Sequence, residues 1–213
     1  MLLYPHAKIN LGLFIKGKRA DGYHLLETLM YPLPDLKDEL ELLPSDEPGI
    51  HLLMEGIEIE GDTEQNLVVR AYRALQKQHP QLPGVEVRLK KNIPAGAGLG
   101  GGSSDAAFTL RGLNALFHLS LSHEQLAALA APLGADVPFF VYDTPMLASG
   151  TGTELRPFDL HLPYRIELIT PPIHSATAAA YKALNISACD PSRDLAQVLH
   201  GPVSAWPTSL VND

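Results

Sequence analysis

A glycine-rich stretch at residues 94–105, PAGAGLGGGSSD, separates two runs with different patterns. Apolar residues alternate at 85–89, which predicts a strand, and the alanine-rich run at 106–117 predicts a helix. Glycines leave the backbone N–H groups between the two accessible, because no Cβ atoms block the approach of a ligand. The start of the helix adds unpaired N–H groups and the positive end of the helix dipole. The stretch therefore predicts a loop that binds an anion, with phosphate as the best fit.

Two other kinds of glycine loop fit less well. A Walker A loop requires a lysine where this chain has Ser103. The glycines do match the spacing of a dinucleotide-binding fingerprint, but that motif needs a second strand after the helix. Residues 121–130 instead predict a second helix, with Ser122 and Gln125 spaced as a capping box. A nicotinamide oxidoreductase and a flexible glycine linker therefore remain the weaker alternatives.

Composition narrows the class of protein. The chain has 213 residues, of which 46% are hydrophobic, enough for one large domain or two small ones. Its net charge of −8 argues against a nucleic-acid partner. No apolar run is long enough to span a bilayer, and the first residues lack the features of a secretion signal, so we expect no membrane partner. A single cysteine, Cys189, excludes an intrachain disulfide and favours the cytoplasm.

The first part of the chain predicts a hairpin. Residues 7–18 alternate between apolar and polar or small residues, which indicates a half-buried strand with Lys8 and Asn10 on one face. An Asp-Gly turn follows, and the returning strand at 23–33 opens with Tyr23 and His24. An adjacent tyrosine and histidine at the mouth of a strand could stack on a planar base and hydrogen-bond its edge.

Further elements are expected along the chain. Asn66 is a plausible N-cap for a helix over 67–75, and Gly134 is expected to cap the end of the second helix. Asp136 then lies between that helix end and an apolar run, where partial desolvation could tune its basicity. No clear element is expected at the end of the chain. The remaining predictions are strands at 38–43, 50–59 and 164–170, a hairpin at 146–158 and a helix that begins near Ser175.

The glycine stretch resembles the phosphate-binding motif of the GHMP small-molecule kinases. Four further segments resemble motifs of that family in the same order along the chain. The R-x-D-G-Y-H segment and the triple glycine resemble the branch that phosphorylates 4-diphosphocytidyl-2-C-methyl-D-erythritol. The resemblance extends from Ala7 to about Tyr181, and the four segments are AKINL at 7–11, RADGYH at 19–24, NL at 66–67 and GADVPF at 134–139.

The resemblance implies roles for individual residues. Asp136 would be the general base and also touch the substrate, and Lys8 would stabilise this carboxylate and the moving phosphoryl group. The remaining residues implied to contact the substrate are Asn10, Tyr23, His24, Thr177 and Tyr181. ATP and Mg²⁺ would be the cofactors, with no metal ligands assigned. Asn66 and Lys91 would lie near the adenine. The residues implied to hold the ATP phosphates are Pro94, Ala95, Gly96, Ala97, Gly98, Leu99, Gly100, Gly101, Gly102, Ser103 and Ser104.

The implied reaction is phosphorylation of the 2-hydroxyl of 4-diphosphocytidyl-2-C-methyl-D-erythritol, in the non-mevalonate synthesis of isoprenoids in the bacterial cytoplasm. The implied fold is α+β. Residues 1–158 would form an ATP-binding domain like domain 2 of ribosomal protein S5, and residues 159–213 part of an α+β C-terminal domain. The family carries a further glycine motif in its C-terminal half. No segment of this chain matches that motif, so a truncated C-terminal domain is expected. A kinase for another small alcohol and an inactive ATP-binding fragment therefore stay open.

Overall fold

The computed structural model describes residues 1–59, 61–169, 184 and 189–213. The chain divides into two compact units, which we call unit 1 and unit 2. The strands β2 and β3 each contribute residues to both units. Unit 1 consists of Met1–Lys8, Pro32–Ala95 and Leu99–Asp143, and unit 2 consists of Ile9–Tyr31, Gly96–Gly98 and Thr144–Asp213.

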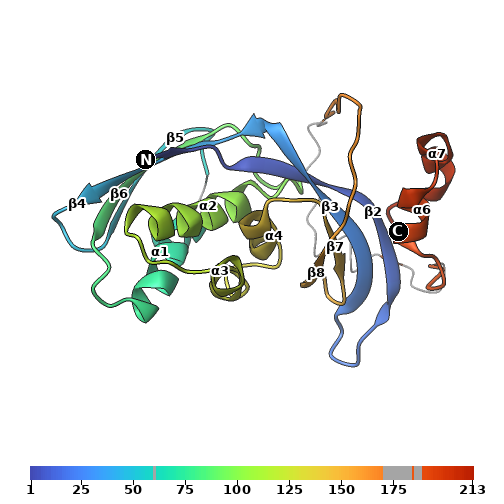
Figure 1. Cartoon of the computed structure of the whole chain (residues 1–213), viewed down its shortest axis with the longest axis horizontal. Coiled ribbons are helices and arrows are strands. Elements are labelled where there is room, and N and C mark those ends of the chain that lie inside the picture. Colours follow the sequence, from blue (N-terminus) through green and yellow to red (C-terminus); the bar gives the residue numbers. More distant parts are fainter. Residues whose placement is uncertain (60, 170–183, 185–188) are drawn as a thin grey trace. The chain divides into compact units, whose positions relative to one another are not determined.

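Unit 1 is a four-stranded sheet with helices on one face (Figure 1). The strand order is β1-β4-β6-β5, in which β4 and β6 are antiparallel and β5 and β6 are parallel. A crossover through α1 joins the two parallel strands. The elements are β1 (Leu2–Leu3), β4 (Glu39–Ser45), β5 (Ile50–Gly56), η1 (Thr63–Gln65), α1 (Leu67–Gln78), β6 (Gly84–Lys91), α2 (Gly101–Leu116), α3 (His123–Ala130) and α4 (Val137–Tyr142).

Period-two alternation in the central strands explains why the helices cover one face only. Leu42 of β4 pairs with Val87 of β6, and both side chains are fully buried. On the other face, Glu39 accepts a hydrogen bond of 2.9 Å from its register partner Lys90. Helix α2 approaches the covered face closely at Gly112. An apolar core beneath the helices therefore holds unit 1 together.

Helix ends follow the local sequence signals in two cases. The side-chain oxygen of Asn66 accepts a hydrogen bond from the N–H of Val68, so the N-cap expected for α1 is confirmed. Ser122 and Gln125 form the expected capping box at the start of α3. Gly134 was expected to cap the end of α3, but that helix ends at Ala130 with Ala131 as its C-cap. Pro132 explains the early end, because proline cannot continue a helix.

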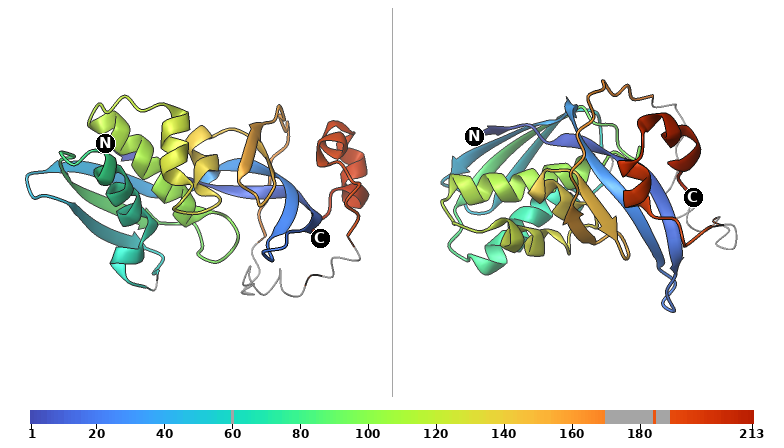
Figure 2. Two further views of the ribbon diagram at one scale, coloured as in Figure 1. Left: turned by 90° about the horizontal axis from the view of Figure 1, so that it is seen from below. Right: turned by 45° about the vertical axis from the view of Figure 1, so that its right-hand side comes forward.

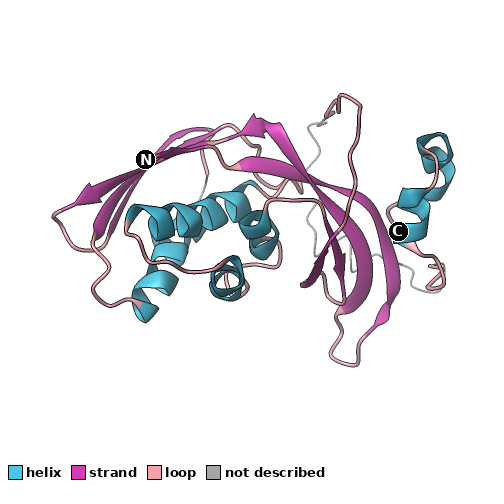
Figure 3. Ribbon diagram, viewed as in Figure 1, coloured by secondary structure: helices cyan, strands magenta, loops and turns pink. Residues whose placement is uncertain are grey.

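Unit 2 is built on a second four-stranded sheet, with strand order β2-β3-β7-β8 (Figure 3). Both views in Figure 2 show the last helices beside β2. Phe14 of β2 and Leu29 of β3 share a buried cluster with Leu195 and Leu199 of α6. The elements are β2 (His6–Lys18), β3 (His24–Lys37), β7 (Met146–Ser149), β8 (Glu154–Pro157), α6 (Leu195–His200), η3 (Val203–Ala205) and α7 (Trp206–Ser209).

Three expectations from the sequence are wrong in this part of the chain. Strand β2 is not half-buried, since the neighbours Phe14 and Ile15 are both buried, and α6 packs on the side of Phe14. Residues 164–169 form no strand, although their apolar residues suggested one. The end of the chain is ordered, because the backbone N–H of Asp213 donates to the carbonyl oxygen of Leu13 (2.9 Å). The helix expected near Ser175 lies outside the described residues.

Among the described residues, no helix is long and apolar enough to cross a bilayer.

Candidate active site

Helix α2 begins at Gly101, inside the glycine stretch and not at Ala106 as expected. Gly100 precedes it with a left-handed backbone (φ 73°), a conformation that glycine adopts without steric cost. A Cβ atom on Gly101 would lie 2.9 Å from the side chain of Ile93, so close packing selects glycine there too. The low helix propensity of glycine and serine concealed this first turn, which tertiary packing stabilises.

The start of α2 has the properties of an anion site. Its N-cap residue is Gly100, so no side chain caps the first N–H groups of the helix. The N–H of Ser104 bonds to the carbonyl oxygen of Gly100 (2.8 Å), whereas the N–H groups of Gly101, Gly102 and Ser103 come earlier in the first turn. These groups and the positive end of a 16-residue helix favour a phosphate.

Lys8 and Asp136 form the charged pair at this site. The Nζ atom of Lys8 lies 3.4 Å from a carboxylate oxygen of Asp136. The lysine side chain is 6% exposed, and that of the aspartate is 32% exposed. Asp136 is the N-cap residue of α4, but its side chain makes no capping hydrogen bond. Its carboxylate can therefore accept a proton from a bound hydroxyl group.

The glycine loop contacts the strand that carries Lys8. The backbone N–H of Lys8 donates to the carbonyl oxygen of Leu99 (2.9 Å). A Cβ atom on Gly100 would lie 3.2 Å from the Cγ atom of Lys8 and 2.9 Å from the ring of Phe140 in α4. Strand β2, the loop and α4 thus meet where a cation, an acid and a helix N-terminus are close together. Such a set can bind a phosphoryl group and activate a hydroxyl group.

Lys91 is held inside unit 1 by two acids. Its ammonium group pairs with Asp105 (2.6 Å) and also with Asp38. Asp38 accepts two backbone hydrogen bonds as well, from the N–H of Asn92 and of Ile93. Burial raises the pKa of Asp105 to about 7, although Lys91 opposes this shift. This ion cluster joins the end of β6 to the start of α2, the two ends of the glycine loop.

A second cluster lies at the other end of α4. The Nε2 atom of His6 is 2.5 Å from a carboxylate oxygen of Asp143, and Arg111 contacts the other oxygen at 2.9 Å. Burial would lower the pKa of His6, but the hydrogen bond and the charge of Asp143 outweigh it and raise that pKa. Burial likewise would raise the pKa of Asp143, and its two cationic partners lower it. His6 therefore keeps its proton to a higher pH than an isolated imidazole does, and Asp143 loses its proton at a lower pH than an isolated carboxyl group does.

The side chain of Asn66 makes contacts within unit 1. Its side-chain oxygen caps α1, and its Nδ2 atom lies 3.4 Å from the sulfur of Met54 in β5. The side chain of Asn66 therefore serves the capping role that the sequence predicted.

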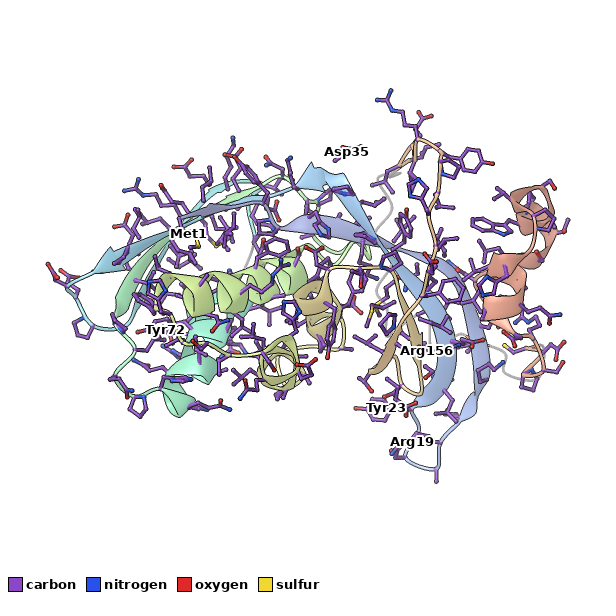
Figure 4. The ribbon with its side chains drawn as sticks, viewed as in Figure 1. Met1, Arg19, Tyr23, Asp35, Tyr72 and Arg156 are labelled. Carbon is purple, nitrogen blue, oxygen red and sulfur yellow. The ribbon has the colours of Figure 1, made fainter. Side chains whose placement is uncertain are left out.

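The residues implied to contact a base lie in unit 2. Tyr23 is 66% exposed and stands near the tip of the β2–β3 hairpin, as does Arg19 (Figure 4). The expected turn is present, with the N–H of Gly22 bonded to the carbonyl oxygen of Arg19 (3.0 Å). His24 is the first residue of β3, and Asn10 in β2 donates to Thr28 (3.0 Å). Thr177 and Tyr181 lie outside the described residues.

Sequence reasoning missed the acids and the histidine of both clusters. Asp38 and Lys91 are 53 positions apart in the chain, and His6 and Asp143 are 137 positions apart. No spacing rule joins groups so distant. The one available signal was local, because Asp105 ends the glycine-rich stretch directly before the predicted helix. Among the described residues, no group of three or more histidines, cysteines or acids is placed to hold a metal ion.

Comparisons with known proteins agree on one family. The sequence profile of the GHMP kinases N terminal domain matches residues 66–144. The chain is 46% identical over 216 residues to 4-diphosphocytidyl-2-C-methyl-D-erythritol kinase of Bacteroides thetaiotaomicron, and 42% identical over 214 residues to that of Parabacteroides distasonis. Each alignment covers all of this chain and 77% of the relative.

Solved structures lead to the same group. A crystal structure of 4-(cytidine 5'-diphospho)-2C-methyl-D-erythritol kinase superposes with a TM-score of 0.78 at 35% identity. That match covers 93% of this chain and 70% of the other. Mevalonate kinase of Methanococcus jannaschii, at 15% identity and a TM-score of 0.56 over 75% of this chain, shares the fold. The α+β fold expected from the sequence is confirmed.

Proposed function

The chain belongs to the GHMP kinases, in the branch of the 4-diphosphocytidyl-2-C-methyl-D-erythritol kinases, and on that premise we propose which residues carry its reaction. The reaction moves the terminal phosphoryl group of ATP to the 2-hydroxyl group of 4-diphosphocytidyl-2-C-methyl-D-erythritol, a step in isoprenoid synthesis. The observation that supports the assignment most is the Lys8–Asp136 pair beside the uncapped start of α2. The proposed location is the cytoplasm, in keeping with the single cysteine.

Each group at the site has a proposed step. Asp136 accepts the proton of the attacking hydroxyl group, whose oxygen then bonds to the γ-phosphorus while the bond to the β-phosphate oxygen breaks. Lys8 stabilises the carboxylate and the negative charge on the moving group. The N–H groups at the start of α2, with the loop that precedes it, hold the phosphates of ATP. Asn66 and Lys91 are proposed to lie near the adenine, in addition to their contacts inside unit 1.

Magnesium is proposed to enter with the nucleotide. Mg²⁺ is bound in such sites by phosphate oxygens, waters and one or two carboxylates, so it needs no cluster of protein ligands. When bound, it would neutralise charge on the phosphates. The hydroxyl group of Ser103 at the start of α2 is an oxygen donor of the kind that suits it. A Cβ atom on Gly134, two residues before Asp136, would lie 3.9 Å from the Ser103 oxygen.

The cytidine end of the substrate is assigned to the β2–β3 hairpin. Tyr23 is proposed to stack on the cytosine ring, because its aromatic side chain is largely exposed at the hairpin tip. His24 is proposed to hydrogen-bond the edge of the base, and Asn10 to help place the substrate. The resemblance adds Thr177 and Tyr181 to these contacts.

The reaction is tested by product identity. The 213-residue chain would be incubated with ATP, magnesium and 4-diphosphocytidyl-2-C-methyl-D-erythritol. A fusion that continues after Asp213 with the remaining part of the Bacteroides thetaiotaomicron relative would be assayed beside it. We expect ADP and a 2-phosphorylated product, detected by phosphorus NMR, from at least one of the two. ATP consumption by both with no phosphorylated product, or preference for an alcohol without a base, would overturn the assignment.

Tyr23→Ala tests the cytidine contact. Loss of one base–aromatic stack costs about 1–3 kcal/mol, so the KM for the cytidine substrate should rise on the order of tenfold or more. The KM for ATP should stay within about twofold of the wild-type value, because Tyr23 has no proposed contact with ATP. Tyr4→Ala is the matched control, since Tyr4 is also exposed but belongs to none of the motifs. An unchanged KM for the cytidine substrate would remove Tyr23 from the site.

A further inference from the structure

Two charged pairs join strand β2 to helix α4, one at each end of the helix. Lys8 pairs with Asp136, which immediately precedes α4. His6, two residues earlier on the same strand, pairs with Asp143, which immediately follows α4. Residues two apart on a strand share a face, so both cations of β2 point toward the helix. All four residues belong to unit 1.

The length of α4 and the spacing of His6 and Lys8 on β2 allow a contact at each end of the helix. Seven residue steps along a helix cover about 10 Å, and two steps along a strand cover about 7 Å. The side chains close the remaining difference. Residues 137–141 of α4 are buried in the apolar core of unit 1, and the two charged pairs add one polar contact to β2 at each end of the helix.

The two pairs differ in tightness. The His6–Asp143 contact is 2.5 Å long, and the imidazole packs edge-on against Phe108 of α2 with the ring centroids 5.6 Å apart. The Lys8–Asp136 contact is 3.4 Å long, and the two acids are about equally exposed, at 32% for Asp136 and 28% for Asp143. A short, charge-assisted hydrogen bond is stronger than a longer contact between the same kinds of charge. The tight pair can therefore fix the frame while the loose pair remains able to engage a substrate.

Hydrogen-bond acceptors surround the imidazole. Its Nδ1 atom faces the carbonyl oxygen of Ala7 at 2.9 Å, and its Nε2 atom faces the carboxylate of Asp143. Only the imidazolium form can donate to both. Arg111 completes the cluster, because it contacts Asp143 and the carbonyl oxygen of Phe140 (3.2 Å) in α4.

We propose that His6 and Asp143 are positioning residues for the Lys8–Asp136 pair: their contact holds α4 at its far end, and this places the Asp136 carboxylate for proton transfer. The inference rests on the proposed function, in which Asp136 is the base. Neither residue touches the substrate in this scheme, so their loss should reduce turnover and leave nucleotide binding in place.

His6→Gln and Asp143→Asn test the pair by kinetics. Asparagine tolerates the left-handed backbone at position 143 (φ 59°), so that variant removes mainly the charge. Each change should lower kcat on the order of tenfold, since small misplacement of a catalytic group is costly. The KM for ATP should stay within about twofold. The kcat of the double variant should lie within about twofold of the kcat of the more impaired single variant, because the two residues act as a unit.

Tyr72→Phe is the matched control. It removes a buried hydroxyl group whose hydrogen bond to the carbonyl oxygen of Pro83 (3.1 Å) lies away from β2 and α4. It should reduce thermal stability without the loss of kcat. Unchanged kcat in both test variants, or a tenfold loss in Tyr72→Phe as well, would overturn the proposal.

NMR of the ligand-free chain provides a readout that does not depend on turnover. In His6→Gln and Asp143→Asn, the backbone amide signals of Asp136 and Val137 should shift, as well as those beside position 143. Shifts confined to Tyr142 and Asp143 would mean that the pair holds only its own end of the helix, and would overturn the positioning role. If the wild-type chain and its fusion fail to phosphorylate the substrate while these shifts appear, the proposed function fails and the structural coupling stands.

Discussion

Asp105 is a buried carboxyl group whose titration should affect the stability of unit 1. Its pKa is raised from 3.8 to about 7, chiefly by burial. Between these values the folded chain holds a proton that the unfolded chain has released, so this group's contribution to stability is full below about pH 4. The contribution is lost as the pH rises through about 7.

Asp105→Asn removes this pH-dependent contribution, because asparagine resembles the protonated acid and does not titrate. The free energy of unfolding of the variant, minus that of the wild type, should therefore increase from pH 4 to pH 8. Urea unfolding at several pH values measures it. Asp46→Asn, at an exposed acid, should show a constant difference. A constant difference for Asp105→Asn would contradict the raised pKa.

Asp136→Asn separates chemistry from nucleotide binding. The amide keeps the shape of the side chain but cannot accept the hydroxyl proton, so kcat should fall by roughly 10²–10⁴-fold. Affinity for ATP should change little, because the start of α2 and its loop are untouched. Rapid-quench measurement of product and a nucleotide titration give the two quantities. Full turnover in this variant would remove Asp136 as the base.

At the scale of residues, the sequence predicted site residues that lie within a motif, but it did not predict contacts between residues from distant segments. Lys8 and Asp136 were found because each lies in a segment that resembles a family motif, and they are in contact. Asp38 offered no such signal. Its partner Lys91 is 53 positions away, and its other bonds go to backbone N–H groups, which no side-chain pattern records.

Two glycines of α2 provide an element-scale test. A Cβ atom on Gly112 would lie 2.5 Å from methyl groups of Leu3 and Leu42, whereas one on Gly102 would meet nothing closer than 3.7 Å. Gly112→Ala should lower the free energy of unfolding by about 1–3 kcal/mol through overpacking. Gly102→Ala should be neutral or stabilising by up to about 1 kcal/mol, since alanine favours a helix. Thermal unfolding of both variants checks this, and equal effects would contradict the close approach of α2 to the sheet.

The elements show which local signals were reliable. The caps at Asn66 and Ser122 are satisfied by bonds within three residues, and the sequence predicted both. The start of α2 depends on the fit of Gly101 against Ile93, and the propensity of glycine indicated a loop instead. At residues 164–169 apolar residues alternate without forming a strand, because alternation describes a pattern of exposure and does not supply a neighbouring strand.

For the whole molecule, the sequence predicted the α+β class and the order of most strands and helices, but not the division into units. Each unit contains segments from separate parts of the chain, and β2 and β3 change unit along their length. A linear boundary at residue 158 stays a prediction. Helix α6 was missed because its short apolar stretch gives a weak periodic signal, and its burial depends on Phe14 far earlier in the chain.

The shared strands predict that the chain unfolds in one cooperative transition. The backbone of β2 runs from Lys8 in unit 1 directly into unit 2, so disorder in one unit frees a strand of the other. Trp206 is the only tryptophan and lies in unit 2, while the three longest described helices, α1, α2 and α3, lie in unit 1. Urea midpoints from tryptophan fluorescence and from far-UV circular dichroism should therefore coincide.

Leu195→Ala tests this cooperativity from unit 2. Loss of its fully buried side chain should cost about 2–5 kcal/mol, because it leaves a cavity against Phe14 and Leu29. If the chain unfolds as one, both probes should shift to the same lower midpoint, and Gly112→Ala in unit 1 should also move both together. A fluorescence midpoint that falls in Leu195→Ala while the circular dichroism midpoint stays in place would show that the two units unfold separately, and that the shared strands do not couple them.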